Sequence, residues 1–236
     1  MVQMILENAP VPDVLTVRVK FHKTGSLQYV SHLDLVRTVT KVLKRAKVPL
    51  KYSEGFNPHP RIAFSAPMSV GLESVAEYMD IRLSKMVDCD AMTAALRACL
   101  TPELYVERVD YPKTKLTDIA LASYEIRIRT TGADVRLAEQ CDEALHAPRI
   151  VVFKRSKSGD KDTDVSSGIK EVKTSFENGE IVVRTLLYAD NARFLNPEYL
   201  LDYLKKTCGV LNGNLLTERY SVYRREVFFE DGRTFS

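Results

Sequence analysis

The stretch Lys51-Tyr52-Ser53-Glu54-Gly55-Phe56-Asn57-Pro58-His59-Pro60-Arg61 joins a predicted helix to a predicted strand. Proline fixes its own φ and disfavours α geometry in the residue before it, so residues 57–60 are expected to be stiff and extended. Gly55 supplies the bend in front of them. Two interpretations are open. The stretch is either a rigid connector in which His59 bonds to backbone, or a loop that presents three side chains to a ligand, namely Asn57, His59 and Arg61.

The residues before this stretch predict a strand and a helix. Apolar and polar residues alternate over residues 15–22, which is typical of a half-buried strand with a basic outer face. Over residues 31–47 apolar residues recur at helical spacing, with Ser31 as the N-cap. Three cations lie together on the opposite side of this helix: Arg37, Lys41 and Lys44.

Three strands and a second helix are predicted after the stretch. The strands cover residues 61–66, 77–83 and 104–111, with a loop over 66–76 and a helix over 89–100. The order strand, helix, strand, strand, helix, strand is that of the ferredoxin-like split βαβ unit. Its helices cover one face of the sheet and leave the other face open.

The second half repeats this order with additions. The pattern predicts a strand at 124–129, a helix at 134–146, a strand at 149–155, a polar and mostly flexible insert at 156–167, strands at 169–176 and 180–187 around an Asn178-Gly179 turn, a helix from Asn196-Pro197 to a stop at Gly209, and a strand at 219–229. We therefore predict an α+β fold of two tandem ferredoxin-like domains with antiparallel sheets, the second decorated. The first covers 13–111, a linker covers 112–121, and the second covers 122–236.

The composition is that of an ordinary globular protein. Of 236 residues, 45% are apolar and 28% charged. No apolar run approaches the roughly 18 residues of a membrane span, and no signal-like segment begins the chain, so no membrane contact and a cytoplasmic location are expected. The cysteines show neither CxxC nor CxxxCxxC spacing, so no local metal or cluster site is predicted: Cys89, Cys99, Cys141 and Cys208.

Positive charge is concentrated in one segment. Residues 16–61 hold ten lysines and arginines against two acidic residues, a net charge of +8, so the remainder carries −5 of the total +3. Such a field is typical of a protein that binds a polyanion, most often nucleic acid. A solvated helix face would give the same count.

The predicted topology separates the histidines. Residues 51–61 lie at one end of the first helix and His22 and His32 at the other, about 22 Å apart, so no metal site is expected from them. The open sheet face would present Arg18 and Lys20 beside Tyr78, as RNA-binding sheets do.

No common catalytic motif occurs in the sequence. The one catalytic candidate is His59, which with Glu54 and Arg61 would supply an acid/base and an anion clamp.

The first half carries six motifs: VRVKF at 17–21, YVSHLDL at 29–35, SEGFNPHPR at 53–61, SAP at 65–67, VGLES at 70–74 and EYMD at 77–80. Together they resemble the radical-SAM-linked proteins, a bacterial family of unknown function. The resemblance implies a partner, a larger radical-SAM protein encoded beside or fused to such chains. It implies no activity and no cofactor of the chain itself, which lacks the CxxxCxxC motif of that cluster.

These observations favour a non-enzymatic, RNA-binding accessory module that works with a radical-SAM partner on tRNA, ribosomal RNA or a ribosome-linked substrate. The predicted nucleic-acid contacts are Arg37, Lys41, Lys44, Lys51, Asn57, His59, Arg61, Arg18 and Lys20. Two alternatives stay open. One is a protein adaptor for the same partner that binds no RNA, and the other is a metal-independent endoribonuclease.

Overall fold

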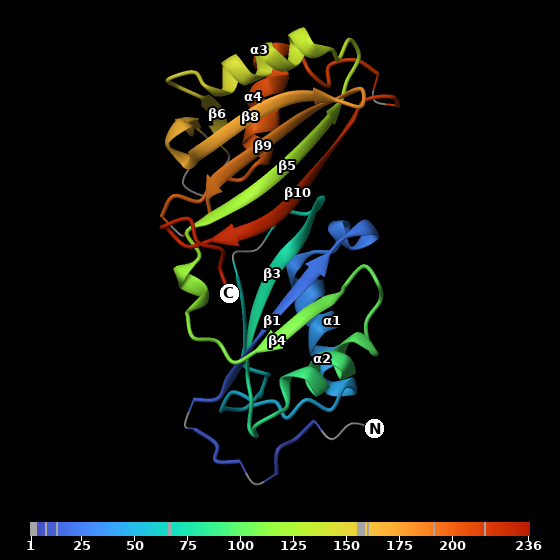
Figure 1. The fold of residues 1–236 in the computed structure, drawn as a ribbon, viewed down its shortest axis with the longest axis vertical. Helices are drawn as coiled ribbons and strands as arrows, with labels where there is room; N and C mark the ends of the chain where they lie inside the picture. Colours follow the sequence, from blue (N-terminus) through green and yellow to red (C-terminus); the bar gives the residue numbers. More distant parts are fainter. Residues whose placement is uncertain are drawn as a thin grey trace. The chain divides into compact units, whose positions relative to one another are not determined.

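The computed structural model describes the chain except residues 1–3, 8, 13, 66–67, 155–158, 160, 191 and 215. The predicted domain start at 13 and strand end at 66 therefore lie outside the described residues. The chain divides into two compact units, residues 1–118 with Ser236 and residues 119–235. Within the described ranges each unit has an antiparallel sheet and two α-helices (Figure 1). The predicted α+β class is confirmed.

The first unit contains β1 (Thr16–Lys23), η1 (Gly25–Tyr29), α1 (His32–Arg45), β2 (Ile62–Phe64), β3 (Leu72–Arg82), α2 (Cys89–Arg97), β4 (Val106–Asp110) and η2 (Leu116–Asp118). Its strands pair antiparallel in the order β4-β1-β3-β2. The alternating apolar residues of β1 face the buried stripes of α1 and α2, as the pattern predicts: Val17, Val19 and Phe21.

The start of β3 differs from the prediction. Residues 66–76 were expected to form a loop, yet β3 begins at Leu72. Leu72, Ser74 and Ala76 alternate as buried residues, and two of these three are too small or polar to give a strong apolar signal. The strand is therefore longer at its N-terminal end than its apolar residues indicate.

Helix α1 has well-defined caps at both ends. The Ser31 side chain accepts a hydrogen bond from the Asp34 N–H, so the predicted N-cap is confirmed. At the other end the Val48 N–H donates to the Leu43 carbonyl at 3.1 Å and the Lys47 N–H to the Lys44 carbonyl at 3.1 Å. This is a Schellman motif, and it holds Lys47 in the left-handed region with a φ of 56°. The motif turns the chain toward residues 51–61.

We expect Lys47→Gly to stabilise the protein by about 1 kcal/mol, because glycine adopts the left-handed conformation without the steric cost of a Cβ. Chemical denaturation measures the change. The control Lys41→Gly removes the same charge from the helix interior and should destabilise by about 1 kcal/mol. Equal losses in the two variants would contradict the C-terminal cap described above.

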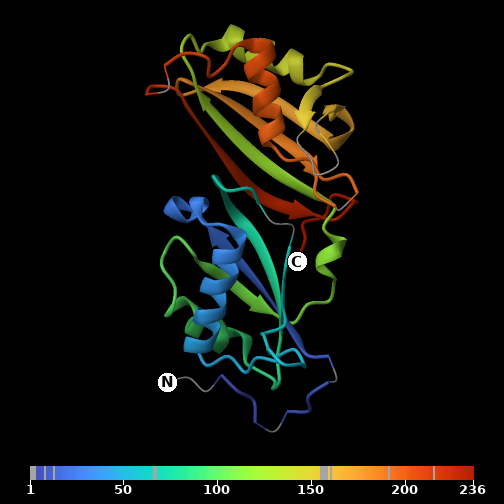
Figure 2. The same cartoon turned by 180° about the vertical axis from the view of Figure 1, so that it is seen from behind.

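The second unit contains β5 (Leu121–Arg129), α3 (Val135–Leu145), β6 (Val151–Lys154), β7 (Lys161–Asp164), η3 (Ser166–Gly168), β8 (Ile169–Glu177), β9 (Glu180–Tyr188), α4 (Glu198–Cys208) and β10 (Arg219–Phe228). Its main sheet has the order β10-β5-β9-β8, and Figure 2 shows α4 crossing one face of it. No helix in the described part of the chain is long and apolar enough to cross a membrane.

The predicted strand at 149–155 has a different role from the one expected. The strand found within it, β6, pairs with β7 in a separate two-stranded sheet. Strand β7 lies inside the insert at 156–167, which was predicted to be mostly flexible; 156–158 and 160 lie outside the described residues. The turn predictions are confirmed, since Asn178 and Gly179 both have positive φ and Gly209 ends α4 with a φ of 71°.

Glu218 connects two loops at one end of this unit, at residues 130–131 and at Gly213, through hydrogen bonds. Its carboxylate accepts from the Thr131 N–H at 2.7 Å, the Gly213 N–H at 2.7 Å and the Thr130 hydroxyl at 2.9 Å. The backbone bond from Thr131 contributes most, and together these bonds lower the pKa of Glu218 to about 2. The charged form of this side chain is therefore the one that stabilises the fold.

We expect the contribution of Glu218 to be fully present above its ordinary pKa of 4.5 and to disappear as pH falls toward about 2. Glu218→Gln should thus be less stable than the parent at neutral pH, with a difference that shrinks in acid. Thermal melts across this range measure it. Glu139→Gln, at an exposed position on α3, is the control. A difference independent of pH would contradict the role of the charge.

Candidate nucleic-acid interface

The cations of α1 lie on its exposed side, opposite the stripe that packs into the core. Arg37 forms an ion pair with Asp34 at 3.0 Å. Lys41 has no ion-pair partner among the described residues. The Lys44 ammonium lies 5.9 Å from the ring centroid of Tyr52, which belongs to residues 51–61. The helix and the stretch after it therefore share one surface.

Residues 51–61 fold into a tight hairpin. Tyr52 and Pro60 form an antiparallel bridge, and the Ser53 N–H donates to the His59 carbonyl at 2.8 Å. The Ser53 hydroxyl lies 3.0 Å from His59 Nδ1 and accepts from the His59 N–H at 3.1 Å. The segment predicted to be extended, residues 57–60, is thus one arm of this hairpin. The Ser53 side chain stabilises the hairpin through its hydrogen bonds to His59.

Three cations meet where this hairpin joins the sheet. The Lys51 N–H donates to the Arg82 carbonyl at 2.9 Å, the Arg82 N–H to the Arg61 carbonyl at 2.9 Å, and the Arg61 N–H to the Lys51 carbonyl at 3.0 Å. These bonds close a ring of three residues, which we call the cation ring. Lys51 and Arg61 are exposed and Arg82 is half-buried. None has a carboxylate partner in the part of the chain that the structure describes.

The strand register brings two of these cations face to face. Ile62 pairs with Ile81, so the antiparallel register sets Arg61 directly opposite Arg82. Like charges opposite each other on neighbouring strands are destabilising. The arrangement therefore costs stability unless an anion neutralises it.

The hairpin tip presents side chains of two kinds. Phe56 is fully exposed, and Asn57 beside it is also exposed. Gly55 before them has a φ of 119°, which a residue with a side chain adopts only under strain. The tip thus offers one aromatic face and one amide above the cation ring.

His59 is exposed, as the ligand-presenting interpretation requires. Its Nδ1 faces Ser53, and no carboxylate contacts the ring in the described structure. Groups of three or more metal-ligating side chains are also not found among the residues the structure describes. The hairpin therefore has the chemistry of anion recognition.

The prediction that Arg18 and Lys20 lie on an exposed sheet face is wrong. Arg18 is 3% exposed and donates to both Asp80 oxygens, at 2.8 and 3.0 Å. Lys20 is 8% exposed, and its ammonium lies 3.3 Å from Glu107. Arg18 and Asp80 are cross-strand partners on β1 and β3, so register alone brings them together. Both cations are satisfied within the first unit.

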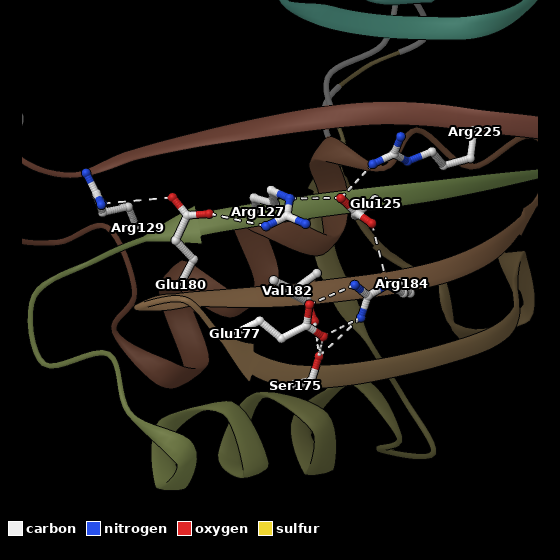
Figure 3. A network of polar contacts seen from close by, with 9 residues as sticks. All are labelled: Glu125, Arg127, Arg129, Ser175, Glu177, Glu180, Val182, Arg184 and Arg225. Carbon is white, nitrogen blue, oxygen red and sulfur yellow. Dashed lines mark hydrogen bonds and ion pairs between the residues drawn. The ribbon is translucent and has the colours of Figure 1, made fainter.

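The second unit carries a charged sheet face that the sequence did not single out (Figure 3). Glu125 at its centre accepts from Arg127 and Arg225, each at 2.8 Å, and lies 3.5 Å from Arg184. Glu177 binds Arg184 through both carboxylate oxygens, at 2.6 and 2.9 Å. Alternating charges at 125, 127 and 129 were visible in the sequence. Their partners were not, because they come from β9 and β10.

The carboxylates in this network are held ionised. Burial alone raises the pKa of Glu125, but hydrogen bonds from Arg225 and Arg127 outweigh it and lower that pKa. Hydrogen bonds from Arg184 and Ser175 lower the pKa of Glu177 to about 2. The arginines therefore keep fixed anionic partners at neutral pH.

The chain is thus a two-unit α+β protein whose cation ring has no carboxylate partner among the described residues. Residues 16–197 match the family DUF2344, described as "Uncharacterized protein conserved in bacteria". The chain belongs to this family. No curated protein matches it.

Solved structures give weak similarities. A chain of a Cbf5-Nop10-Gar1 complex is 12% identical with a TM-score of 0.49, over 97% of this chain and 59% of that one. An unknown protein from Galdieria sulphuraria is 12% identical with a TM-score of 0.24, over 90% and 99%. This chain therefore spans 59% of the first of these, and neither similarity bears on function.

We expect Arg61→Gln to stabilise the protein by roughly 0.2–1 kcal/mol at low salt, because it removes the repulsion from Arg82. The gain should vanish at high salt, where the charges are screened. Denaturant midpoints at two salt concentrations measure it. Arg149→Gln, which loses a contact with Asp164 at 3.5 Å, should show no gain. A loss in Arg61→Gln at low salt would contradict the like-charge pairing.

Proposed function

We propose that this chain is an RNA-binding accessory module whose contact surface is formed by α1 and the hairpin at residues 51–61. The observation that carries the proposal is the cation ring. Lys51, Arg61 and Arg82 are held together by backbone bonds and have no carboxylate partner in the described structure. A phosphate group is the ligand that would neutralise them.

The surroundings of the ring support a nucleic acid. Lys41 and Lys44 extend the positive surface along α1. The exposed ring of Phe56 provides a platform on which an unpaired base can stack, and Asn57 and His59 offer hydrogen-bonding groups for base edges. Phosphate contacts would thus supply affinity, and the hairpin tip would supply selectivity.

We also propose that both units are ferredoxin-like. In each, the first strand of the unit lies between its last and third strands, as in the orders β4-β1-β3-β2 and β10-β5-β9-β8. The hairpin of β6 and β7 is then an insertion between the first helix and second strand of the later unit.

The partner is inferred from the sequence motifs of the first half. Their resemblance to radical-SAM-linked proteins suggests that the module brings RNA to such an enzyme. The adaptor alternative rests on a specific observation, because exposed aromatic side chains such as Phe56 and Tyr52 are also what a protein pocket would bind. Loss of partner co-purification in Arg61→Ala, with no RNA affinity in the parent, would favour the adaptor.

The ribonuclease alternative requires RNA cleavage in the presence of a chelator, and His59→Ala must abolish that cleavage.

We expect the triple variant Lys51→Ala, Arg61→Ala, Arg82→Ala to lose RNA affinity and to show a weaker salt dependence. If each cation neutralises one phosphate, the slope of log affinity against log salt falls by about 2. Fluorescence anisotropy with labelled single-stranded RNA measures both quantities.

The matched control also removes one lysine and two arginines, at exposed positions of the second unit: Arg136, Arg149 and Lys206. Both triple variants change the net charge equally, so a generic charge effect would weaken them equally. Equal weakening, or no binding by the parent at low salt, would exclude the proposed surface.

A further inference from the structure

The open face of the second sheet carries cations that its carboxylates do not account for. Arg219 on β10 lies directly opposite Arg129 on β5, and Lys173 on β8 lies directly opposite Arg184 on β9. Both are like-charge cross-strand pairs. Glu177 binds Arg184 and Glu180 lies 3.9 Å from Arg129, whereas Lys173 and Arg219 have no ion-pair partner among the described residues. The same arrangement occurs at Arg61 and Arg82 in the first unit.

The arginines on this face are braced but exposed. Glu125 is 10% exposed at its side chain, whereas the three arginines around it retain between 36% and 50% exposure. Glu177 also binds Arg184, and Glu180 lies 3.6 Å from Arg127. Each guanidinium has five N–H donors, and these three carboxylates do not occupy all of them. Exposed ion pairs contribute little stability, so holding the fold together does not explain the cluster. A carboxylate that fixes several guanidinium groups leaves the remaining donors in place for another anion.

A β-bulge in β10 brings Arg225 close to Glu125. The register of β10 against β5 shifts between Arg224 and Glu226, which leaves Arg225 as the extra residue. Its guanidinium reaches Glu125 and lies 4.3 Å from the ring centroid of Tyr223. An open groove of about 990 Å³ runs over this region, and its charged lining includes Glu125, Lys170, Lys173, Arg184 and Arg225.

The array is too wide for one phosphate group. It extends from Lys173 on β8 to Arg225 on β10, which is three strand spacings or about 14 Å. A ligand that engages the whole array must carry several anionic groups in an extended chain. An open sheet with stacked aromatic and guanidinium groups suits unpaired bases better than a rigid duplex.

We propose that the open sheet face of the second unit binds the phosphate backbone of single-stranded RNA through arginines that Glu125 holds in position. This inference rests on the proposed RNA-binding function and adds a second contact surface to it. Glu125 is the positioning residue for Arg184 and Arg225, and these two arginines make the contacts together with Arg129, which lies opposite Arg219.

The first test is Arg129→Ala with Arg225→Ala in the full chain, measured by anisotropy with a fluorescein-labelled single-stranded oligouridylate. Losing a charge-assisted contact costs about tenfold in affinity, and two lost phosphate contacts reduce the salt slope by about 1.4. The control is Arg136→Ala with Arg149→Ala. Equal affinities in the two double variants would overturn the proposal, and so would tighter binding of the duplex form of the probe.

The direction of the change in RNA affinity in Glu125→Gln distinguishes two roles of Glu125. If Glu125 only reduces the positive charge, its neutralisation tightens RNA binding. If it positions the arginines, Glu125→Gln weakens binding about tenfold, although the face becomes more positive. A melting curve confirms that the variant is folded, and Arg225→Ala, which removes one exposed side chain, tests the RNA contact separately. Unchanged or tighter binding in Glu125→Gln would overturn the positioning role.

The two proposals fail in different ways. If the parent binds RNA and only the Lys51, Arg61 and Arg82 triple variant weakens it, the proposed function stands and the second surface is excluded. If the parent binds no single-stranded RNA at low salt, both proposals are excluded. Weakening in both sets of variants, beyond their controls, supports both surfaces.

Discussion

Three backbone hydrogen bonds link Lys51, Arg82 and Arg61 in a ring. These bonds place three cations of the first unit next to one another. Backbone bonds do not depend on the side chains, so any three residues able to adopt this geometry would form them. The positions are occupied by cations nonetheless, and two of them repel each other across the strands. The fold thus supplies the geometry, and it does not itself require cations at these three positions.

The two units treat arginine in different ways. On β1, Arg18 is buried and donates to both oxygens of Asp80 and to the hydroxyl and carbonyl of Thr114, so its charge belongs to the structure of the first unit. In the second unit Glu125 divides its two oxygens among three arginines that stay half-exposed. Formal charge counts cannot distinguish these cases. The difference lies in how many donors remain after the internal bonds are formed.

Much of the fold follows from periodicity. The alternation in β1 and the apolar stripe with Ser31 in α1 predict both elements, because each is defined by its own residues. Pairing between distant strands was beyond such reasoning. It joined Arg18 to Asp80, set Arg61 opposite Arg82 and gave β6 a partner within a polar insert. Of the candidate site, an exposed loop at residues 51–61 was one of two open interpretations, and neither its hairpin geometry nor the role of Arg82 was predicted.

The repulsion at the cation ring also links occupancy to folding. An anion that binds there removes an unfavourable term present in the folded state, so the bound protein gains more stability than the contacts alone provide. The free and the anion-bound forms of the protein would then differ in their cellular lifetime. A cell that degrades less stable chains faster would remove the unoccupied protein first and keep the amount of this module close to the amount of its ligand.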